Sequence, residues 1–195
     1  MIIQKAESFF RCLTLILIAA LIYACSASIR VFTHPEADMS YYTKVGVVPF
    51  QNLSSDRLAG EKFSTEFTTA LLAANKFEVV EQGIFVNAVV RTVGSRTVPD
   101  GLTADQLKKV AEATGVQGVF EGVVTQYNMS SSGGESLPVI GVEARLVDTE
   151  TGTIVWKATI SERGGPKTPI IGVGEIHTLG ELSQKLSKVL VSRIN

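Results

Sequence analysis

Cys25 is the residue of this sequence best placed to do chemistry, because the segment before it has the layout of an export signal. Lys5 and Arg11 precede an apolar run over residues 12–21, and the small residue Ala24 stands directly before Cys25. A basic start, a short apolar stretch and a small residue before the cleavage point are typical of a secretory signal peptide. The run is too short for a transmembrane anchor, which needs ~20 apolar residues.

The end of this segment, Ile22-Tyr23-Ala24-Cys25, resembles the lipobox of bacterial lipoproteins. In that family the cysteine thiol receives a diacylglycerol, the signal is cut just before the cysteine, and the new amino group is acylated. The resemblance implies that Cys25 is lipidated and anchors the chain in a membrane. Ser26, in place of an Asp, implies export to the bacterial outer membrane with the domain facing the periplasm. A cleavable signal without lipid is the alternative.

Composition limits what the remaining chain can do. The 195 residues carry a net charge of −1, so the sequence offers no strongly basic face and predicts no nucleic-acid partner. The two cysteines are Cys12 and Cys25, and Cys12 lies in the predicted signal, so the processed chain can form no internal disulfide. We divide the chain into a signal peptide (1–24), the lipidated cysteine with a tether (25–43) and one domain (44–195).

Hydrophobic patterns predict an α/β (α+β) domain with a single mixed sheet flanked by helices. The tether shows no sustained period and is expected to be extended, or in part to pack on the domain through Ile29, Val31, Phe32 and Tyr41. Asp148 and Gly152 predict a tight hairpin turn. The predicted strands cover residues 44–50, 77–81, 116–128, 139–147 and 153–161, and the predicted helices cover 57–75, 83–94, 103–115 and 175–194.

Several short motifs occur in an order that suggests a family. They are Val45-Gly-Val-Val-Pro-Phe50, Phe77-Glu-Val-Val-Glu-Gln82, Val119-Phe-Glu-Gly122 and Leu146-Val-Asp-Thr-Glu-Thr-Gly-Thr-Ile-Val-Trp156. Together they resemble the CsgG-type curli-secretion lipoproteins, and they are similar to relatives with the same periplasmic domain, the LpoB-like activators of peptidoglycan synthases. Loops 129–137 and 163–174 are too short for the membrane-spanning hairpins of the curli channel, since a spanning hairpin needs roughly twenty residues. The resemblance therefore implies the periplasmic domain without the pore.

The sequence predicts no catalytic, cofactor-binding or metal-binding residues. It contains no G-x-S-x-G and no G-x-x-x-x-G-K, His34 and His177 are expected to be solvated, and Trp156 is expected in the core. Two apolar segments could meet a partner. Residues 169–173 either form a contact or lie back on the sheet, and residues 84–90 are either packed on both sides or meet a second subunit.

These observations predict a lipoprotein that is held in the membrane through Cys25 and acts as a non-catalytic binding or assembly module of the cell envelope. Its predicted partners are the membrane and either another protein or further copies of itself. The alternative within the binding class is an LpoB-like activator of a peptidoglycan synthase, and the rival from another class is a small periplasmic enzyme.

Overall fold

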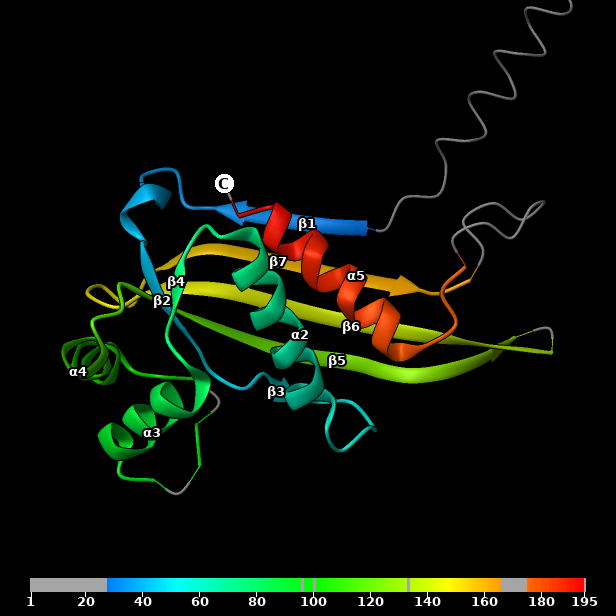
Figure 1. The fold of residues 1–195 in the computed structure, drawn as a ribbon, viewed down its shortest axis with the longest axis horizontal. Coiled ribbons are helices and arrows are strands. Elements are labelled where there is room, and N and C mark those ends of the chain that lie inside the picture. The colour runs from blue at the N-terminus through cyan, green and yellow to red at the C-terminus, as the bar shows by residue number, and fades with distance from the viewer. Residues whose placement is uncertain (1–27, 96, 100, 133, 166–174, 195) are drawn as a thin grey trace, which may run out of the picture.

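One mixed seven-stranded sheet organises the domain, with the strand order β1-β7-β6-β5-β2-β4 and with β3 beside β5 (Figure 1). The computed structural model describes residues 28–165, except 96, 100 and 133, and residues 175–194. The strands are β1 (Ser28–Thr33), β2 (Lys44–Val47), β3 (Gln51–Asn52), β4 (Glu78–Val79), β5 (Gly118–Ser132), β6 (Glu135–Asp148) and β7 (Ile154–Arg163). The helices are α2 (Ala59–Ala74), α3 (Gln82–Val93), α4 (Ala104–Thr114) and α5 (Leu179–Ser192), with a 3-10 turn η1 (Met39–Tyr41). The predicted fold class is confirmed.

Helices α2 and α5 cover one face of the sheet and enclose the larger core (Figure 1). Phe67, Phe120 and Trp156 meet there edge to face, with ring centroids 5.4 Å and 6.2 Å apart for the two pairs that share Phe120. Such aromatic pairs stabilise a core beyond the area that they bury. Trp156 is fully buried and its indole N–H donates to the Arg193 carbonyl at 3.0 Å, which confirms the prediction that it lies in the core.

Helices α3 and α4 pack on the opposite face of the sheet. Consecutive strand residues point to opposite faces, and Val119 belongs to the α3–α4 cluster whereas Phe120 belongs to the larger core. This second cluster is small and lies at the β2 end of the sheet. None of the helices in the described part of the chain is long and apolar enough to cross a membrane.

The predicted turn between β6 and β7 is confirmed. Asp148 Oδ1 accepts hydrogen bonds from the backbone N–H groups of Glu150 and Thr151 at 3.0 Å and 2.7 Å, and Gly152 has a φ of 73°. A residue with positive φ closes such a turn at no steric cost only if it is glycine. Helix α4 likewise begins after the capping box at Thr103 and ends before the left-handed Gly115, as the sequence predicts.

Two predicted boundaries are wrong. Residues 130–136 were expected to form a flexible loop, but β5 and β6 continue through them as a paired hairpin from Ser130↔Leu137 to Ser132↔Glu135. Serine side chains do not prevent backbone pairing, and Gly134, with a φ of 86°, closes the turn. Helix α2 begins at Ala59, two residues after the predicted start at residue 57, and Leu58 before it makes no side-chain capping bond.

Residues 28–43 pack on the domain instead of extending from it. Strand β1 runs antiparallel to β7 in the register Ser28↔Ser161 to Thr33↔Trp156. Tyr42 is buried, and its hydroxyl donates to Asp148 Oδ2 at 2.9 Å. Of the two expectations for this segment, the packed arm agrees with the structure for Ile29, which packs against the core, but Val31, Phe32 and Tyr41 are 44%, 47% and 45% exposed. Residues 1–27, including Cys25, lie outside the described residues.

Candidate functional site: a groove beside helix α3

Helix α3 is not packed on both sides, as one expectation for residues 84–90 had it, and the other expectation, contact with a second subunit, stays a prediction. Phe85 and Val89 are fully buried against the sheet, whereas Val86 and Val90 line a groove and Ile84 is 64% exposed. Glu81 caps the start of the helix, and its carboxylate accepts a hydrogen bond from the Ile84 N–H at 2.7 Å. The left-handed Gly94 caps its end. Some apolar side chains of this segment therefore lie in the core, and the others lie at the surface or in the groove.

A glycine on β2 lets α3 come close to the sheet. A Cβ on Gly46 would lie 2.2 Å from the ring of Phe85, far inside van der Waals contact. Only glycine allows the Phe85 ring to rest directly on the strand. Gly122 has the same role beneath Phe50, because a Cβ there would lie 2.3 Å from the Phe50 ring. These two close contacts place α3 and the Phe50 ring, both of which line the groove.

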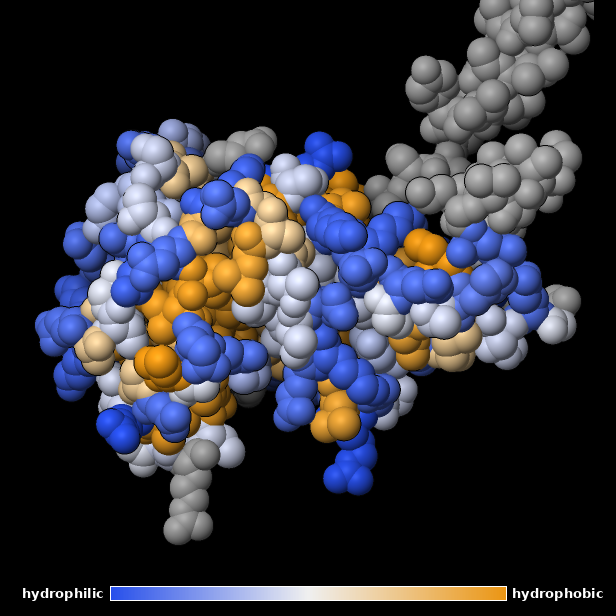
Figure 2. Space-filling model, viewed as in Figure 1, coloured by the Kyte–Doolittle hydropathy of each residue, from blue (hydrophilic) through white to orange (hydrophobic). Residues whose placement is uncertain are grey.

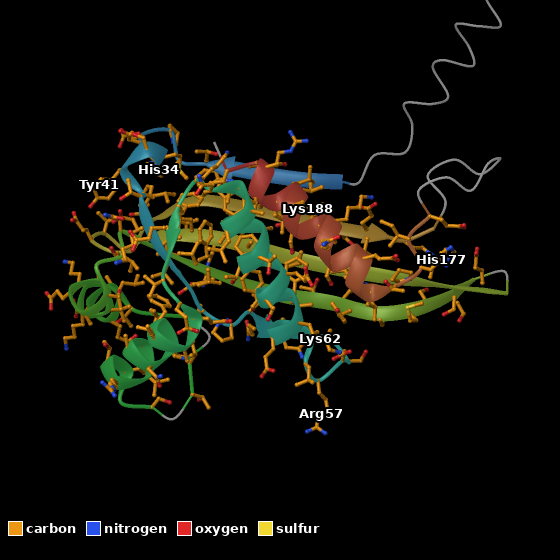
Figure 3. The ribbon with its side chains drawn as sticks, viewed as in Figure 1. His34, Tyr41, Arg57, Lys62, His177 and Lys188 are labelled. Carbon is orange, nitrogen blue, oxygen red and sulfur yellow. The ribbon has the colours of Figure 1, made fainter. Side chains whose placement is uncertain are left out.

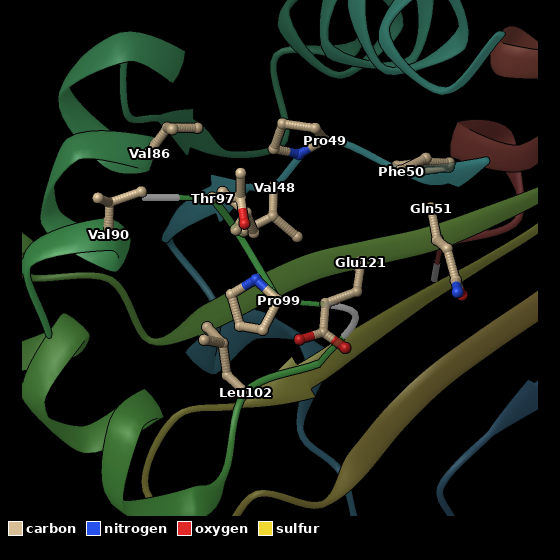
Figure 4. Close-up of a pocket in the computed structure, with 12 residues that line it drawn as sticks. Val48, Pro49, Phe50, Gln51, Val86, Val90, Thr97, Pro99, Leu102 and Glu121 are labelled. Atoms are coloured by element: carbon tan, nitrogen blue, oxygen red, sulfur yellow. The ribbon is translucent and has the colours of Figure 1, made fainter. Parts of the chain in front are cut away.

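The groove is a cavity of about 300 Å³ between α3, the segment after β2 and the loop that leads to α4 (Figure 4). Strands β2 and β3 both pair with β5, and Pro49 lies in the gap between them. The Phe50 N–H donates to the buried Ser64 hydroxyl at 2.8 Å. The volume is at the lower end for small-ligand sites, and the groove suits one or two side chains. Its lining is mainly apolar: Val48, Pro49, Phe50, Val86, Val90, Val98, Pro99 and Leu102.

One ion pair marks the wall of the groove. Glu121 is only 5% exposed, and its Oε2 accepts hydrogen bonds from Arg145 Nε at 2.9 Å and Nη2 at 2.7 Å. In Figure 4 the Glu121 carboxylate points toward Pro99 and Leu102 across the groove. A carboxylate has acceptor positions on both oxygens, so Oε1 can accept a further hydrogen bond. The groove therefore combines apolar walls with one buried acceptor.

An apolar patch also lies on the surface of the domain. Figure 2 shows hydrophobic residues gathered over β4 and α3, at the edge of the sheet that β4 forms. Leu72 and Ile84 are among the large apolar side chains with more than half of their surface exposed. Exposed apolar patches of this kind mark contact sites.

The two histidines lie at opposite ends of the sheet, so they form no common site (Figure 3). His177 Nε2 lies 3.1 Å from Glu175 Oε2, and ligand atoms of Glu135, Glu175 and His177 lie within 4.8 Å of one another. These donors are of types that bind zinc. The sequence analysis missed the cluster because Glu135 reaches it only through the β5–β6 hairpin. Glu135 and His177 are exposed, and the Glu175–His177 ion pair accounts for the closest approach.

Sequence reasoning also missed Glu121 and the loop that carries Val98 and Leu102. A charged residue in the middle of the apolar strand 116–128 was the available signal. Of the two segments expected to meet a partner, residues 84–90 line the groove, and residues 169–173 lie outside the described residues. An apolar groove with a single ion pair suits the binding of another molecule, which places the site in the class of binding modules.

A family model supports a more definite assignment. The model described as the peptidoglycan-synthase activator LpoB matches residues 18–160. This match covers most of the chain, and the chain belongs to the LpoB family. The resemblance to CsgG-type curli-secretion lipoproteins was therefore wrong, whereas the similarity to LpoB-like activators points to the right family. The quoted motifs lie on strands and turns of the domain, and each of them is short.

Solved structures with the same fold include the following two. The PelC dodecamer from Paraburkholderia phytofirmans is 18% identical, covers 87% of this chain and 97% of its own, and has a TM-score of 0.58. Lipoprotein GNA1162 from Neisseria meningitidis is 22% identical, covers 77% of this chain and 99% of its own, and has a TM-score of 0.55. At these identities the similarity is one of fold alone. A search of curated protein sequences found no match.

Proposed function

We propose that this protein is an outer-membrane lipoprotein whose periplasmic domain activates a peptidoglycan synthase by direct contact. The single observation that carries the proposal is the match of residues 18–160 to the family of that description. An activator acts on an enzyme without catalysing the reaction itself, which agrees with the prediction that the chain is not an enzyme. The proposal replaces the main prediction, a CsgG-like module, by the alternative, an LpoB-like activator of a peptidoglycan synthase.

Anchoring is the first part of the proposal. Cleavage after Ala24 and acylation of Cys25 would leave residues 25–195 as the mature protein, with Cys25 as its only cysteine. More than one acyl chain is needed for stable membrane anchoring, and the lipobox pathway supplies several. Replacement of Cys25 by Ser should leave an unprocessed precursor. Unchanged fractionation of that variant with the outer membrane would contradict the anchor.

The groove beside α3 is the proposed contact for the synthase. It offers what a small protein-binding site requires: an apolar floor and a buried acceptor at Glu121. The fitting partner segment carries an apolar side chain next to a hydrogen-bond donor.

The test is the rate of glycan polymerisation by the synthase of the same organism, measured with and without the protein. Val86→Asp should abolish stimulation, because it places a charge in the apolar lining of the groove at a half-buried position. Gln184→Asp, an equal change of charge at an exposed position of α5, is the matched control and should stimulate normally. Full stimulation by Val86→Asp would move the contact elsewhere, and no stimulation by the wild-type protein would contradict the function.

Self-assembly is a second candidate function. The PelC neighbour is named as a dodecamer, and only two residues separate Cys25 from the described strand β1. A domain held so close to its membrane reaches distant partners poorly, and this favours contacts with neighbouring copies. Light scattering on residues 26–195 over a range of concentrations distinguishes the two, because a ring gives one large defined mass and an activator that works alone gives the mass of a monomer.

A further inference from the structure

Strand β1 forms one edge of the sheet and exposes more apolar surface than an edge strand in water should. Val31 is 44% exposed and Phe32 is 47% exposed, and they extend from opposite faces of the strand. Natural edge strands are protected by charges, bulges or covering elements, because an exposed apolar edge favours association. Among the described residues, β7 is the one strand that pairs with β1.

The chain that leads to β1 is short. From Cys25 to Ser28 there are three residue steps, which span at most about 11 Å whatever their conformation. If Cys25 carries the acyl chains, the first residue of β1 is held within that distance of the membrane surface. The domain therefore rests on the membrane, and the remaining question is which side of it faces the lipid.

The length of the β5–β6 hairpin decides between two orientations. Ser28 is level with Ser161, Gly141 and Gln126 across the sheet. Beyond Gln126, β5 continues for six residues to Ser132, which is about 20 Å of strand. With the strands upright, the end of the hairpin would reach the membrane well before β1 and would enter it. Exposed Ser131 and Glu135 lie at that end, and burying such groups in lipid is costly.

With the strands lying along the membrane, no polar hairpin has to enter the lipid. In that orientation β1 faces the membrane with Val31, Phe32 and the exposed Arg30. Lys188, on the helix that packs over β6 and β7, adds a second positive charge toward this side (Figure 3). Within the described ranges neither Arg30 nor Lys188 has a carboxylate at ion-pair distance. Unpaired basic groups are attracted to anionic lipid headgroups.

We propose that the β1 edge of the sheet is a membrane-binding surface, which lies flat on the lipid headgroups with the strands parallel to the membrane. This inference rests on the proposed lipidation of Cys25. The strand order places β4 five strand spacings from β1, about 24 Å away across the sheet. Figure 1 shows α3 on the side of the sheet away from β1, so the groove faces away from the membrane and stays open to a partner.

The experiment uses the lipidated mature protein in vesicles of phosphatidylethanolamine and phosphatidylglycerol that contain a lipid with a nitroxide on its headgroup. Acylation blocks the thiol of Cys25, so an introduced cysteine is the only site for a fluorescent label. Three single variants are compared: Phe32→Cys on β1, Ile84→Cys on α3 and Ser131→Cys on the hairpin, all exposed positions. Flotation of each variant with the vesicles first establishes that the anchor is present.

We expect the nitroxide to quench the label at residue 32 several times more strongly than the label at residue 84, with residue 131 in between. In addition, Arg30→Gln combined with Lys188→Gln should weaken that quenching in anionic vesicles more than in neutral ones. Strongest quenching at residue 131 would overturn the proposal in favour of the upright orientation. Equal quenching at residues 32 and 84, or a label at residue 32 shielded by a second copy of the chain, would also overturn it. Wild-type protein that fails to float contradicts the lipid anchor instead.

Discussion

The two faces of the sheet differ in the size of the hydrophobic core that covers them. The face under α2 and α5 is closed by aromatic rings and leucines that are almost fully buried, with Trp156 held at its centre by a hydrogen bond. In the described part of the chain, the face under α3 and α4 is covered at one end, and a groove with a buried ion pair opens beside these helices. Stability therefore depends mainly on the first face, while the second has room for a partner. Variants can separate these contributions.

The largest expected effect is on the closed face. Leu186→Asp buries an unpaired charge beneath α5 and should destabilise the fold by more than about 4 kcal/mol. Thermal unfolding followed by circular dichroism should show no cooperative transition. Gln184→Asp, an exposed position of the same helix, should melt close to the wild-type temperature. A normal transition for Leu186→Asp would mean that α5 does not close the core.

Gly46→Ala tests the close packing of α3 on the half-open face. The added Cβ would lie 2.2 Å from the Phe85 ring, so the helix must shift, at a cost of about 1–3 kcal/mol. Chemical denaturation measures that cost. Gly180→Ala, where a Cβ meets nothing within 4 Å, is the matched control and should be neutral or slightly stabilising. Combining Gly46→Ala with Phe85→Leu should recover part of the loss, and strictly additive losses would contradict the clash.

Glu121→Gln separates binding from stability. The substitution keeps the shape of the groove but removes the charge that pairs with Arg145, so we expect about 1.5–3 kcal/mol less stability. Stimulation of the synthase should fall at least several times more than that of Glu143→Gln, which breaks the Lys157 ion pair outside the groove. Equal effects of the two variants on stimulation would show that the groove takes no part in binding.

The smallest effect concerns pH and the β6–β7 turn. Burial raises the pKa of the Asp148 carboxyl, but hydrogen bonds from Thr151, Tyr42 and Glu150 outweigh it and hold that pKa below its ordinary value. The ionised carboxylate therefore stabilises the folded state above the ordinary pKa of an aspartate, and this contribution is lost as the pH falls through the lowered pKa.

Asp148→Asn should reduce the fall in melting temperature between pH 5 and pH 3, and Tyr42→Phe, which removes one donor, should reduce it less. Melting curves at several pH values measure the difference. An identical pH dependence of the melting temperature in the wild type and in Asp148→Asn would show that ionisation of Asp148 does not stabilise the fold.

Local signals predicted much of the fold. The turn from Asp148 to Gly152, the cap at Thr103 and the apolar stripe of α5 are determined by a few neighbouring residues, so they could be recognised one at a time. The hairpin beyond Ser130 was missed because its stability comes from pairing with β6 and not from its own residue types. Strand β1 was missed because an edge strand with exposed residues on both faces shows no alternation.

The groove could be predicted only in part. Residues 84–90 are more apolar than a helix with one buried side needs, and this marked α3 as a candidate contact. The sequence could not pair Glu121 with Arg145, because they lie opposite each other on the neighbouring strands β5 and β6. The motifs by themselves led to the wrong family, because each of them is short and lies on a strand or turn of the fold. A match along residues 18–160 identified the LpoB family.

The sequence by itself predicted the export signal and the lipid site at Cys25, and it determined the main helices and strands and the fold class, because each depends on residues close together in the chain. Only the tertiary structure decided that residues 28–33 close one edge of the sheet, that Gly46 admits Phe85, and that the groove lies on the side away from β1. These features depend on contacts between residues far apart in the chain. Such contacts form only when the sheet has assembled.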